Sequence, residues 1–319
     1  MSILINGASL DHALLETALE AAQVAAALQR PLAGNFEPER WSEKATSDFV
    51  TEVDRESEQL ILARILARFP DHKILAEEGM IKEQKTSADQ THNEIGHENE
   101  QASGDDSPIL WIIDPLDGTT NWLHGYPAYA VSIATLDAQG LRTAVVLNSA
   151  NGDEFMAVRG NGATLNGDPI HVSDLSETRL ALVGTGFPFK KTELLPGYLA
   201  ALGGMLEKTS GVRRAGAAAL DLCDVACGRL DAFWEHWLME WDVAAGALIV
   251  QEAGGTFGSL PEITDPTLSE AISGGKKISD AFSGSSDRLP VGGGAFLAGN
   301  GKLELELARI WMETVQANL

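Results

Sequence analysis

The sequence predicts an α/β (α+β) protein in which helices cover layered β-sheets. Segments with helical periodicity and segments with strand character follow one another in runs along the 319 residues. They do not keep the strict strand–helix order of a Rossmann fold or a barrel. Hydrophobic residues form 44% of the chain, so the chain is long and apolar enough to bury a sizeable core.

Five segments are predicted to be long helices. In the first, leucines and a run of alanines recur at helical spacing until Pro31 stops the pattern. In the second, Leu60, Ile61 and Ile65 lie on one side. The fourth ends at the glycine pair 254–255. The expected helices are residues 11–30, 56–69, 217–228, 242–253 and 303–316.

Short apolar runs bounded by turn residues predict the strands. Turns are expected at residues 160–162 and at Asn166-Gly167, between short extended pieces. The expected strands are residues 73–76, 110–113, 130–136, 142–147, 154–158, 180–185, 231–235 and 295–298.

Two segments lack the apolar residues that a packed element needs. Residues 82–108 are polar and rich in Asp and Glu, so they cannot bury enough surface to order themselves and predict a mobile insertion. Residues 258–290 are rich in Ser and Gly, which indicates a second flexible connection.

The charge balance limits the partners that the protein can have. A net charge of −23 argues against a nucleic acid or an anionic membrane bound through a basic patch. The two cysteines, Cys223 and Cys227, make a poor zinc signature and are expected to be reduced thiols. With no signal-peptide pattern and no apolar run near the ~20 residues of a membrane span, a cytoplasmic location is expected.

The segment from Trp111 to Trp122 is the strongest candidate for chemistry. Asp114 and Asp117 follow an apolar strand and offer the oxygen ligands that Mg²⁺ prefers. The amides from Gly118 onward open a helix and can hold phosphate oxygens. A plain Asp-Gly hairpin turn is the alternative, although Pro115 cannot continue a strand ladder.

Other carboxylates recur at the ends of predicted elements. Asp54 and Asp242 each open a helix, and Glu77-Glu78 end the strand before the polar insertion. Each has a purely structural explanation, because acidic residues stabilise helix N-termini and strand ends are commonly solvated. Residues 184–187, Gly-Thr-Gly-Phe, lack the third glycine of a dinucleotide-binding loop.

The order of these motifs closely resembles that of the inositol monophosphatases, with bacterial members nearest. The resemblance extends from about residue 11 to residue 300, except for the two polar segments, which are longer than the family leads us to expect. Its main motifs are residues 48–54, 77–78, 111–121 and 241–246, with residues 159–163, 185–189 and 213–222 adding to it.

The resemblance implies a layered α-β-α-β-α sandwich of the inositol monophosphatase and fructose-1,6-bisphosphatase type. It implies an N-terminal portion, 1–180, that carries most metal ligands, and a C-terminal portion, 181–319, that carries Asp242 and substrate contacts. The implied activity is Mg²⁺-dependent hydrolysis of a small phosphorylated polyol, first of all inositol monophosphate. A metal-activated water would attack without a phosphoenzyme, Li⁺ would inhibit, and the protein would be a homodimer.

Site roles follow from the resemblance at matching positions. Glu77, Asp114, Asp117, Asp242 and the carbonyl of Leu116 would bind two or three Mg²⁺ ions. Asp54 and Thr119, together with Glu77, would be catalytic by orienting a metal-bound water. Substrate contacts would come from Asp117, Gly118, Thr119, Gly216, Ala217, Ala218, Glu235 and Asp242, with Lys44, Glu78 and Arg214 in support.

The charges of these residues agree with a metal requirement. Five carboxylates in one pocket would repel a phosphate monoester, whereas three Mg²⁺ ions would reverse the sign of the site. Metal is therefore expected to bind before substrate or with it.

Two kinds of alternative stay open. The same machinery could act on histidinol phosphate, fructose 1,6-bisphosphate or a 3′-phosphoadenosine nucleotide, although Glu235 favours a polyol over the nucleotide. A regulatory binding protein that keeps the fold is the second, and the presence of every matched carboxylate argues against it as the sole function.

Overall fold

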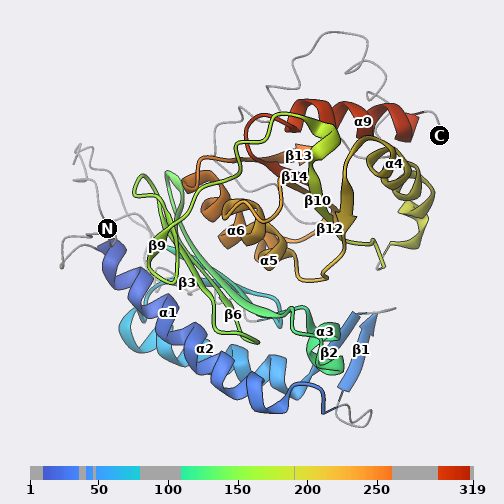
Figure 1. The fold of residues 1–319 in the computed structure, drawn as a ribbon. Helices are drawn as coiled ribbons and strands as arrows, with labels where there is room; N and C mark the ends of the chain where they lie inside the picture. The colour runs from blue at the N-terminus through green and yellow to red at the C-terminus, as the bar shows by residue number, and fades with distance from the viewer. Residues whose placement is uncertain are drawn as a thin grey trace, which may run out of the picture.

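The structure, a computed structural model, describes residues 10–35, 41–45, 48–79, 109–189, 191–260 and 294–316, with only the backbone at 41–45, 48–50, 294 and 316. Its elements form five layers, in the order helices, sheet, helices, sheet, helices (Figure 1). The predicted layered sandwich is thereby confirmed.

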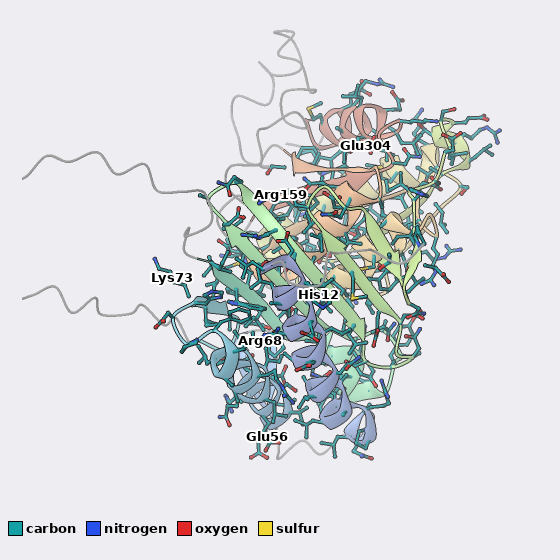
Figure 2. The ribbon with its side chains drawn as sticks, turned by 90° about the vertical axis from the view of Figure 1, so that its left-hand side faces the viewer. His12, Glu56, Arg68, Lys73, Arg159 and Glu304 are labelled. Atoms are coloured by element: carbon teal, nitrogen blue, oxygen red, sulfur yellow. The ribbon has the colours of Figure 1, made fainter. Side chains whose placement is uncertain are left out.

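Helices α1 (Leu10–Gln29) and α2 (Glu52–Arg68) form the first layer. They lie side by side across one face of the larger sheet (Figure 2). The alanines of α1 are buried at three- and four-residue spacing, and their small side chains let the helix approach the sheet closely. Helix α2 begins four residues before the predicted start, because Thr51 and Asp54 cap it reciprocally.

The larger sheet has seven strands in the order β3-β4-β5-β6-β7-β8-β9. Only β3 and β4 pair in parallel; every other neighbouring pair is antiparallel. Strand β4 is buried along nearly its whole length, since helices cover both faces of the sheet. The strands are β3 (Lys73–Ala76), β4 (Leu110–Asp117), β5 (Ala130–Asp137), β6 (Gly140–Asn148), β7 (Glu154–Val158), β8 (Ala163–Leu165) and β9 (Asp168–Pro169).

Helices α5 (Ala218–Ala226) and α6 (Glu240–Glu252) form the middle layer. One apolar cluster joins them to the larger sheet on one side and to the smaller sheet on the other. The expected division near residue 180 separates the strands of the two sheets, but both portions share this core.

The smaller sheet has the order β11-β10-β12-β14-β13. Its strands are β10 (Leu182–Thr185), β11 (Gly211–Arg213), β12 (Ala232–Leu238), β13 (Thr256–Leu260) and β14 (Gly294–Gly299). Helices α4 (Leu195–Lys208) and α9 (Glu304–Gln316) cover its outer face (Figure 1).

Short elements complete the fold. Strands β1 (Trp41–Ala45) and β2 (Asp48–Thr51) pair as an antiparallel hairpin that leads into α2. Helix α3 (Thr119–His124) follows β4 after a single residue. In the described part of the chain, 3₁₀ turns lie at Arg30–Leu32, Thr178–Leu180 and Thr192–Leu194.

Helix α4 is absent from the sequence prediction, and its glycines explain why. Gly203 and Gly204 lower the intrinsic helix propensity of the segment. A Cβ on Gly204 would lie 2.5 Å from the Thr314 side chain of α9. The glycine therefore permits the close packing of these two helices, which a local pattern does not reveal.

The two predicted polar segments lie mostly outside the described residues. Residues 82–108 lie entirely outside them, and residues 261–293 of the second segment do as well. Residues 258–260, which were assigned to the second segment, are instead the end of β13 and pair with β14. No described helix is long and apolar enough to cross a membrane.

Candidate active site

The end of β4 is shaped by Pro115. The β4–β5 pairing shifts register between Asp114 and Asp117, so the proline stands where no ladder bond is required of it. Within this irregularity the backbone N–H of Leu116 donates to Asp114 Oδ1 at 2.9 Å. The irregularity leaves Asp114 and Asp117 together in the last residues of buried β4, which extends beyond the predicted end at Ile113.

Gly118 connects this strand end to α3. It has a φ of +87°, and a Cβ there would lie 2.8 Å from the Ala128 carbonyl. Glycine is thus required both by conformation and by space. The turn lets α3 begin at Thr119, directly after the acidic residues.

The acidic residues form one electrostatic cluster. Asp114 is 2% exposed, and burial raises the pKa of its carboxyl well above the ordinary value. The carboxylates of Glu77, Asp117 and Asp242 raise this pKa further. The backbone N–H of Glu77 donates to the Ile113 carbonyl at 3.2 Å, which continues the β3–β4 ladder and holds Glu77 beside Asp114.

Asp117 lies between the cluster and the start of α5. Its Oδ2 accepts a hydrogen bond from the Ala219 backbone at 2.8 Å. Burial, and then the Asp242 carboxylate, raise the pKa of Asp117 to about 7, against the opposing hydrogen bonds from the α5 backbone. The first turn of α5 therefore holds a carboxylate of the protein itself.

Asp54 joins the cap of α2 to the start of α3. Its Oδ2 accepts hydrogen bonds from the backbone N–H of Thr51, at 2.8 Å, and from the Thr51 hydroxyl. The Thr119 hydroxyl lies 3.0 Å from Asp54 Oδ1 and 3.1 Å from the Leu116 carbonyl oxygen, and can donate to either. Burial raises the pKa of Asp54 above the ordinary value.

Two of the predicted site residues, Asp54 and Asp242, each cap a helix and also belong to the candidate site. Asp54 caps α2 and also contacts Thr119. Asp242 accepts a bond from the Met239 backbone at 2.7 Å in the cap of α6, and it also lines the pocket described below. The capping explanation is thus correct for both, without removing either from the site.

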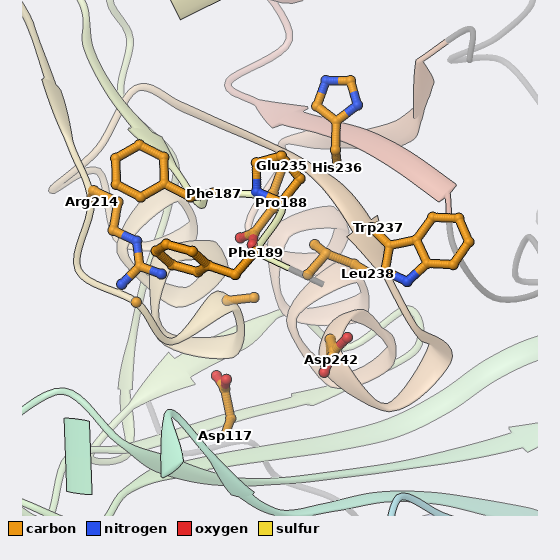
Figure 3. Close-up of a pocket in the computed structure, with 12 residues that line it drawn as sticks. Asp117, Phe187, Pro188, Phe189, Arg214, Glu235, His236, Trp237, Leu238 and Asp242 are labelled. Atoms are coloured by element: carbon orange, nitrogen blue, oxygen red, sulfur yellow. The ribbon is translucent and has the colours of Figure 1, made fainter. Parts of the chain in front are cut away.

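The acidic cluster opens into a pocket, which Figure 3 shows in close-up. Asp117 and Asp242 lie at one end of the pocket, and Glu235 lies between Phe187 and Phe189 on one side and Trp237 on the other. The lining residues are Asp117, Phe187, Pro188, Phe189, Arg214, Gly216, Ala218, Glu235, His236, Trp237, Leu238 and Asp242.

Two glycines make room for the charged side chains of this pocket. A Cβ on Gly186 would lie about 2.0 Å from the Glu235 carboxyl. A Cβ on Gly216, whose φ is +92°, would lie 2.4 Å from the Arg214 guanidinium. Burial raises the pKa of Glu235 well above the ordinary value, and the Asp221, Asp242 and Asp117 carboxylates raise it as well.

The remaining predicted residues occupy different places. Ala217 is buried in the core against Gly118, and its side chain does not belong to the pocket lining. The Glu78 backbone donates to Glu58 Oε2 at 2.9 Å. The backbone of Lys44 lies in β1, and its side chain is outside the described part of the structure.

Several site residues are absent from the sequence prediction. Asn121 Nδ2 lies within hydrogen-bond distance of the carbonyls of Ala128, Ala215 and Gly216, which ties α3 to the pocket wall. Glu58, 4% exposed, supports the end of β3. Glu58 lies in α2 and faces the end of β3. The sequence could identify it only if the packing of α2 against β3 were already known.

The donor set suits a hard divalent cation. Carboxylate oxygens dominate it, and the charges that act on Asp114 all come from other carboxylates. Among the described residues, no three His, Cys, Asp or Glu side chains are already gathered as in a closed metal site. Mg²⁺ does not need such a cage, because it commonly binds through one or two carboxylates, waters and substrate phosphates.

The comparisons with known proteins agree with this fold. The sequence matches the model of the inositol monophosphatase family over residues 10–269. The chain belongs to the inositol monophosphatase family.

Relatives of known name or structure support this membership. An inositol-1-monophosphatase of Synechocystis sp. is 37% identical over 302 residues, which cover 95% of this chain and 90% of that protein. A Pseudomonas aeruginosa protein named Nus factor SuhB is 48% identical over 216 residues, 67% of this chain and 73% of that protein. The structure of inositol monophosphatase from Anabaena (Nostoc) superposes with a TM-score of 0.70 at 33% identity and covers 95% of this chain and 96% of that chain.

Proposed function

We propose that the protein is a Mg²⁺-dependent phosphatase that hydrolyses small phosphate monoesters, with inositol monophosphate as the first candidate substrate. The observation that carries the proposal is that the carboxylates of Glu77, Asp117 and Asp242 act together on the buried carboxyl of Asp114, at the end of β4. Burial and mutual repulsion of these carboxylates are costly in the empty protein, and a bound divalent cation removes that cost.

The metal assignment rests on the donor atoms. Glu77, Asp114, Asp117, Asp242 and the carbonyl of Leu116 would hold two or three Mg²⁺ ions. Bound Mg²⁺ would lower the pKa of water, and would neutralise charge on the phosphate and the leaving oxygen. Lys44 and Glu78 would support this end of the site, and the Li⁺ sensitivity implied by the family belongs to the proposal too.

Thr119 and Asp54 would position the attacking water. With Asp54 Oδ1 as acceptor of the Thr119 proton, the lone pairs of the hydroxyl point away to accept a proton from a water molecule. The two bonds from Thr51 to Asp54 Oδ2 fix the carboxylate in place. Direct attack by water involves no covalent phosphoenzyme.

The leaving alcohol would occupy the pocket beyond Asp117 and Asp242. Glu235 would bind a hydroxyl of this alcohol, with Gly216, Ala218 and Arg214 nearby. A hydroxyl contact to Glu235 favours a phosphorylated polyol over a 3′-phosphoadenosine nucleotide, and histidinol phosphate and fructose 1,6-bisphosphate stay as alternatives. Cytoplasmic location and homodimerisation complete the proposal.

The direct test begins with protein from which divalent ions have been removed. Titration with Mg²⁺ should raise the melting temperature, since a ligand of the folded state stabilises it. The same titration should turn on phosphate release from a monoester. If neither the melting temperature nor the activity depends on Mg²⁺, the metal assignment is refuted.

A second candidate is a regulatory role in transcription, which the name Nus factor SuhB of the Pseudomonas relative suggests. Such a role would depend on contacts rather than on hydrolysis. An Asp114→Asn variant separates the two, because it should lose hydrolysis and keep its surface. Equal co-purification of RNA polymerase with wild type and variant would support this role, and none with either would remove it.

A further inference from the structure

Trp237 has a backbone conformation that large side chains rarely adopt. Its φ is +65°, and Asn166, with a φ of +53°, is the only other non-glycine residue with positive φ in the described part of the chain. Asparagine tolerates this region, whereas a bulky residue is strained there. The surrounding structure must therefore hold Trp237 in place.

A bulge in β12 produces this conformation. The β12–β14 pairing shifts register between His236 and Leu238, so Trp237 is the extra residue. Bulges near active sites commonly redirect a side chain. Here the residues on both sides of Trp237 are buried, while the Trp237 side chain is 37% exposed and lines the pocket.

A cation holds the indole ring. The Lys191 Nζ lies 4.3 Å from the ring centroid of Trp237. The ammonium group is attracted to the face of the indole ring by the ring quadrupole. The indole is thereby fixed as a wall of the pocket, on one side of Glu235 in Figure 3.

The wall on the other side of Glu235 is aromatic as well. Phe187 and Phe189 pack edge to face with centroids 5.6 Å apart. The Arg214 guanidinium lies 5.2 Å and 5.0 Å from their centroids and braces both rings. Phe189 remains 47% exposed. The pocket thus offers ring surfaces on both sides of a single carboxyl.

In the proposed function the phosphate binds beside Asp117 and Asp242, so the aromatic surfaces of the pocket face the leaving group. A polyol uses Glu235, whereas a flat aromatic ring can also stack on the aromatic walls. We propose that Trp237 is a specificity-determining residue, which extends the substrates to phosphate monoesters whose alcohol carries a flat aromatic ring. This inference rests on the proposed function for its account of the phosphate end.

Binding of two phosphonates tests the inference without turnover. One is 1-naphthylmethylphosphonate, which carries the flat ring, and the other is 2-hydroxyethylphosphonate, which carries only a hydroxyl. Water does not cleave their carbon–phosphorus bonds, so calorimetry with Mg²⁺ present reports affinity alone. The wild-type protein should bind the aromatic ligand at least tenfold more tightly, which corresponds to ~1.4 kcal/mol.

The Trp237→Gly variant should abolish this preference. Glycine adopts the same φ without strain, so the variant is expected to fold. Its affinity for the aromatic phosphonate should fall about tenfold, with the affinity for the hydroxyethyl ligand unchanged. Trp237→Phe should keep most of the preference. Asn166→Gly, which removes the other positive-φ side chain outside the pocket, should keep all of it.

The outcomes also separate this inference from the proposed function. Equal binding of both phosphonates by the wild type, or the same preference in Trp237→Gly, would overturn the role of Trp237. The latter result would leave the exposed indole as a contact for another macromolecule. Phosphate release from a polyol ester in the same preparation tests the phosphatase proposal independently, because glycerol 2-phosphate has no ring to stack.

Discussion

The Thr119 hydroxyl and the Asp54 carboxylate are 3.0 Å apart and join two helix starts that are 65 residues apart in sequence. Asp54 belongs to the cap of α2, and Thr119 is the first residue of α3. The pair brings the polar end of the first helical layer to the end of β4. One carboxylate therefore serves both the cap of α2 and the contact with Thr119, the pair that we propose positions the attacking water.

Removal of this hydroxyl should slow hydrolysis without unfolding the protein. Thr119→Val keeps the shape of the side chain, and Asp54 retains both bonds from Thr51. Positioned proton acceptors contribute about 10²–10⁴-fold, so kcat should fall at least a hundredfold with little change in KM. The neighbouring Thr120 is exposed, and Thr120→Val should be near wild type. Comparable losses in both variants would count against the pair.

Asp114→Asn should separate stability from activity. Asparagine can still accept the bond from the Leu116 backbone, but it removes one charge from the crowded cluster. Because the pKa of Asp114 is raised, ionisation opposes folding, and the metal-free variant should gain about 1 kcal/mol or more, roughly 2 °C in melting temperature.

The same variant should lose about a thousandfold or more in phosphate release, because several kcal/mol of metal-dependent stabilisation disappear. The exposed Asp168→Asn variant is the matched control and should change neither quantity. Near-normal turnover by Asp114→Asn would remove Asp114 from the metal ligands.

Glu235→Gln should alter substrate choice. A hydroxyl that loses a charged acceptor costs roughly 1.5–3 kcal/mol, so kcat/KM for inositol 1-phosphate should fall ten- to a hundredfold. Release from 4-nitrophenyl phosphate, which has no hydroxyl in that position, should be spared. If kcat/KM falls equally for both esters, Glu235 instead acts at the phosphate end of the site or stabilises the fold.

His236 should make part of the stability depend on pH. It is 4% exposed, and burial lowers its pKa to about 4. Its Nε2 accepts a hydrogen bond from the Trp311 indole at 3.1 Å, so the folded state holds it neutral. The unfolded chain binds a proton below about pH 6.5, and stability should fall by roughly 2 kcal/mol between pH 7 and pH 5 through this residue.

The measurement compares urea unfolding of the wild type and His236→Gln at both pH values. Buried carboxyls with raised pKa values make both proteins more stable as the pH falls. The test is therefore the difference between the two proteins, from which this shared contribution cancels. The variant is expected to be less stable at pH 7 but to lack this ~2 kcal/mol dependence. Parallel pH profiles of the two proteins would show that His236 does not titrate as described.

The sequence was sufficient for most of the architecture and for the acidic centre. Apolar residues at helical spacing predict α1, and short apolar runs predict the strands β4 to β7. These strands are apolar because helices cover both faces of the sheet. The carboxylates at strand and helix ends were visible as motifs. Glu58 and Asn121 were not, since their roles depend on which elements pack together.

The aromatic pocket walls were the least predictable part. Trp237 faces the pocket only because a bulge interrupts β12, and no local pattern marks that register shift. Helix α4 was missed for a related reason, because Gly204 is explained only by its contact with α9. Local propensity gives no access to such long-range contacts.

Phosphate release from a panel of monoesters, with Mg²⁺ and then with EDTA, tests the central claim most directly. The panel comprises inositol 1-phosphate, histidinol phosphate, fructose 1,6-bisphosphate and 3′-phosphoadenosine 5′-phosphate. We expect Mg²⁺-dependent release that is greatest for inositol 1-phosphate, is lost in EDTA and returns when Mg²⁺ is restored. Release from none of these esters at saturating Mg²⁺, or release that EDTA leaves unchanged, would contradict a metal-dependent phosphatase built on Asp114, Asp117 and Asp242.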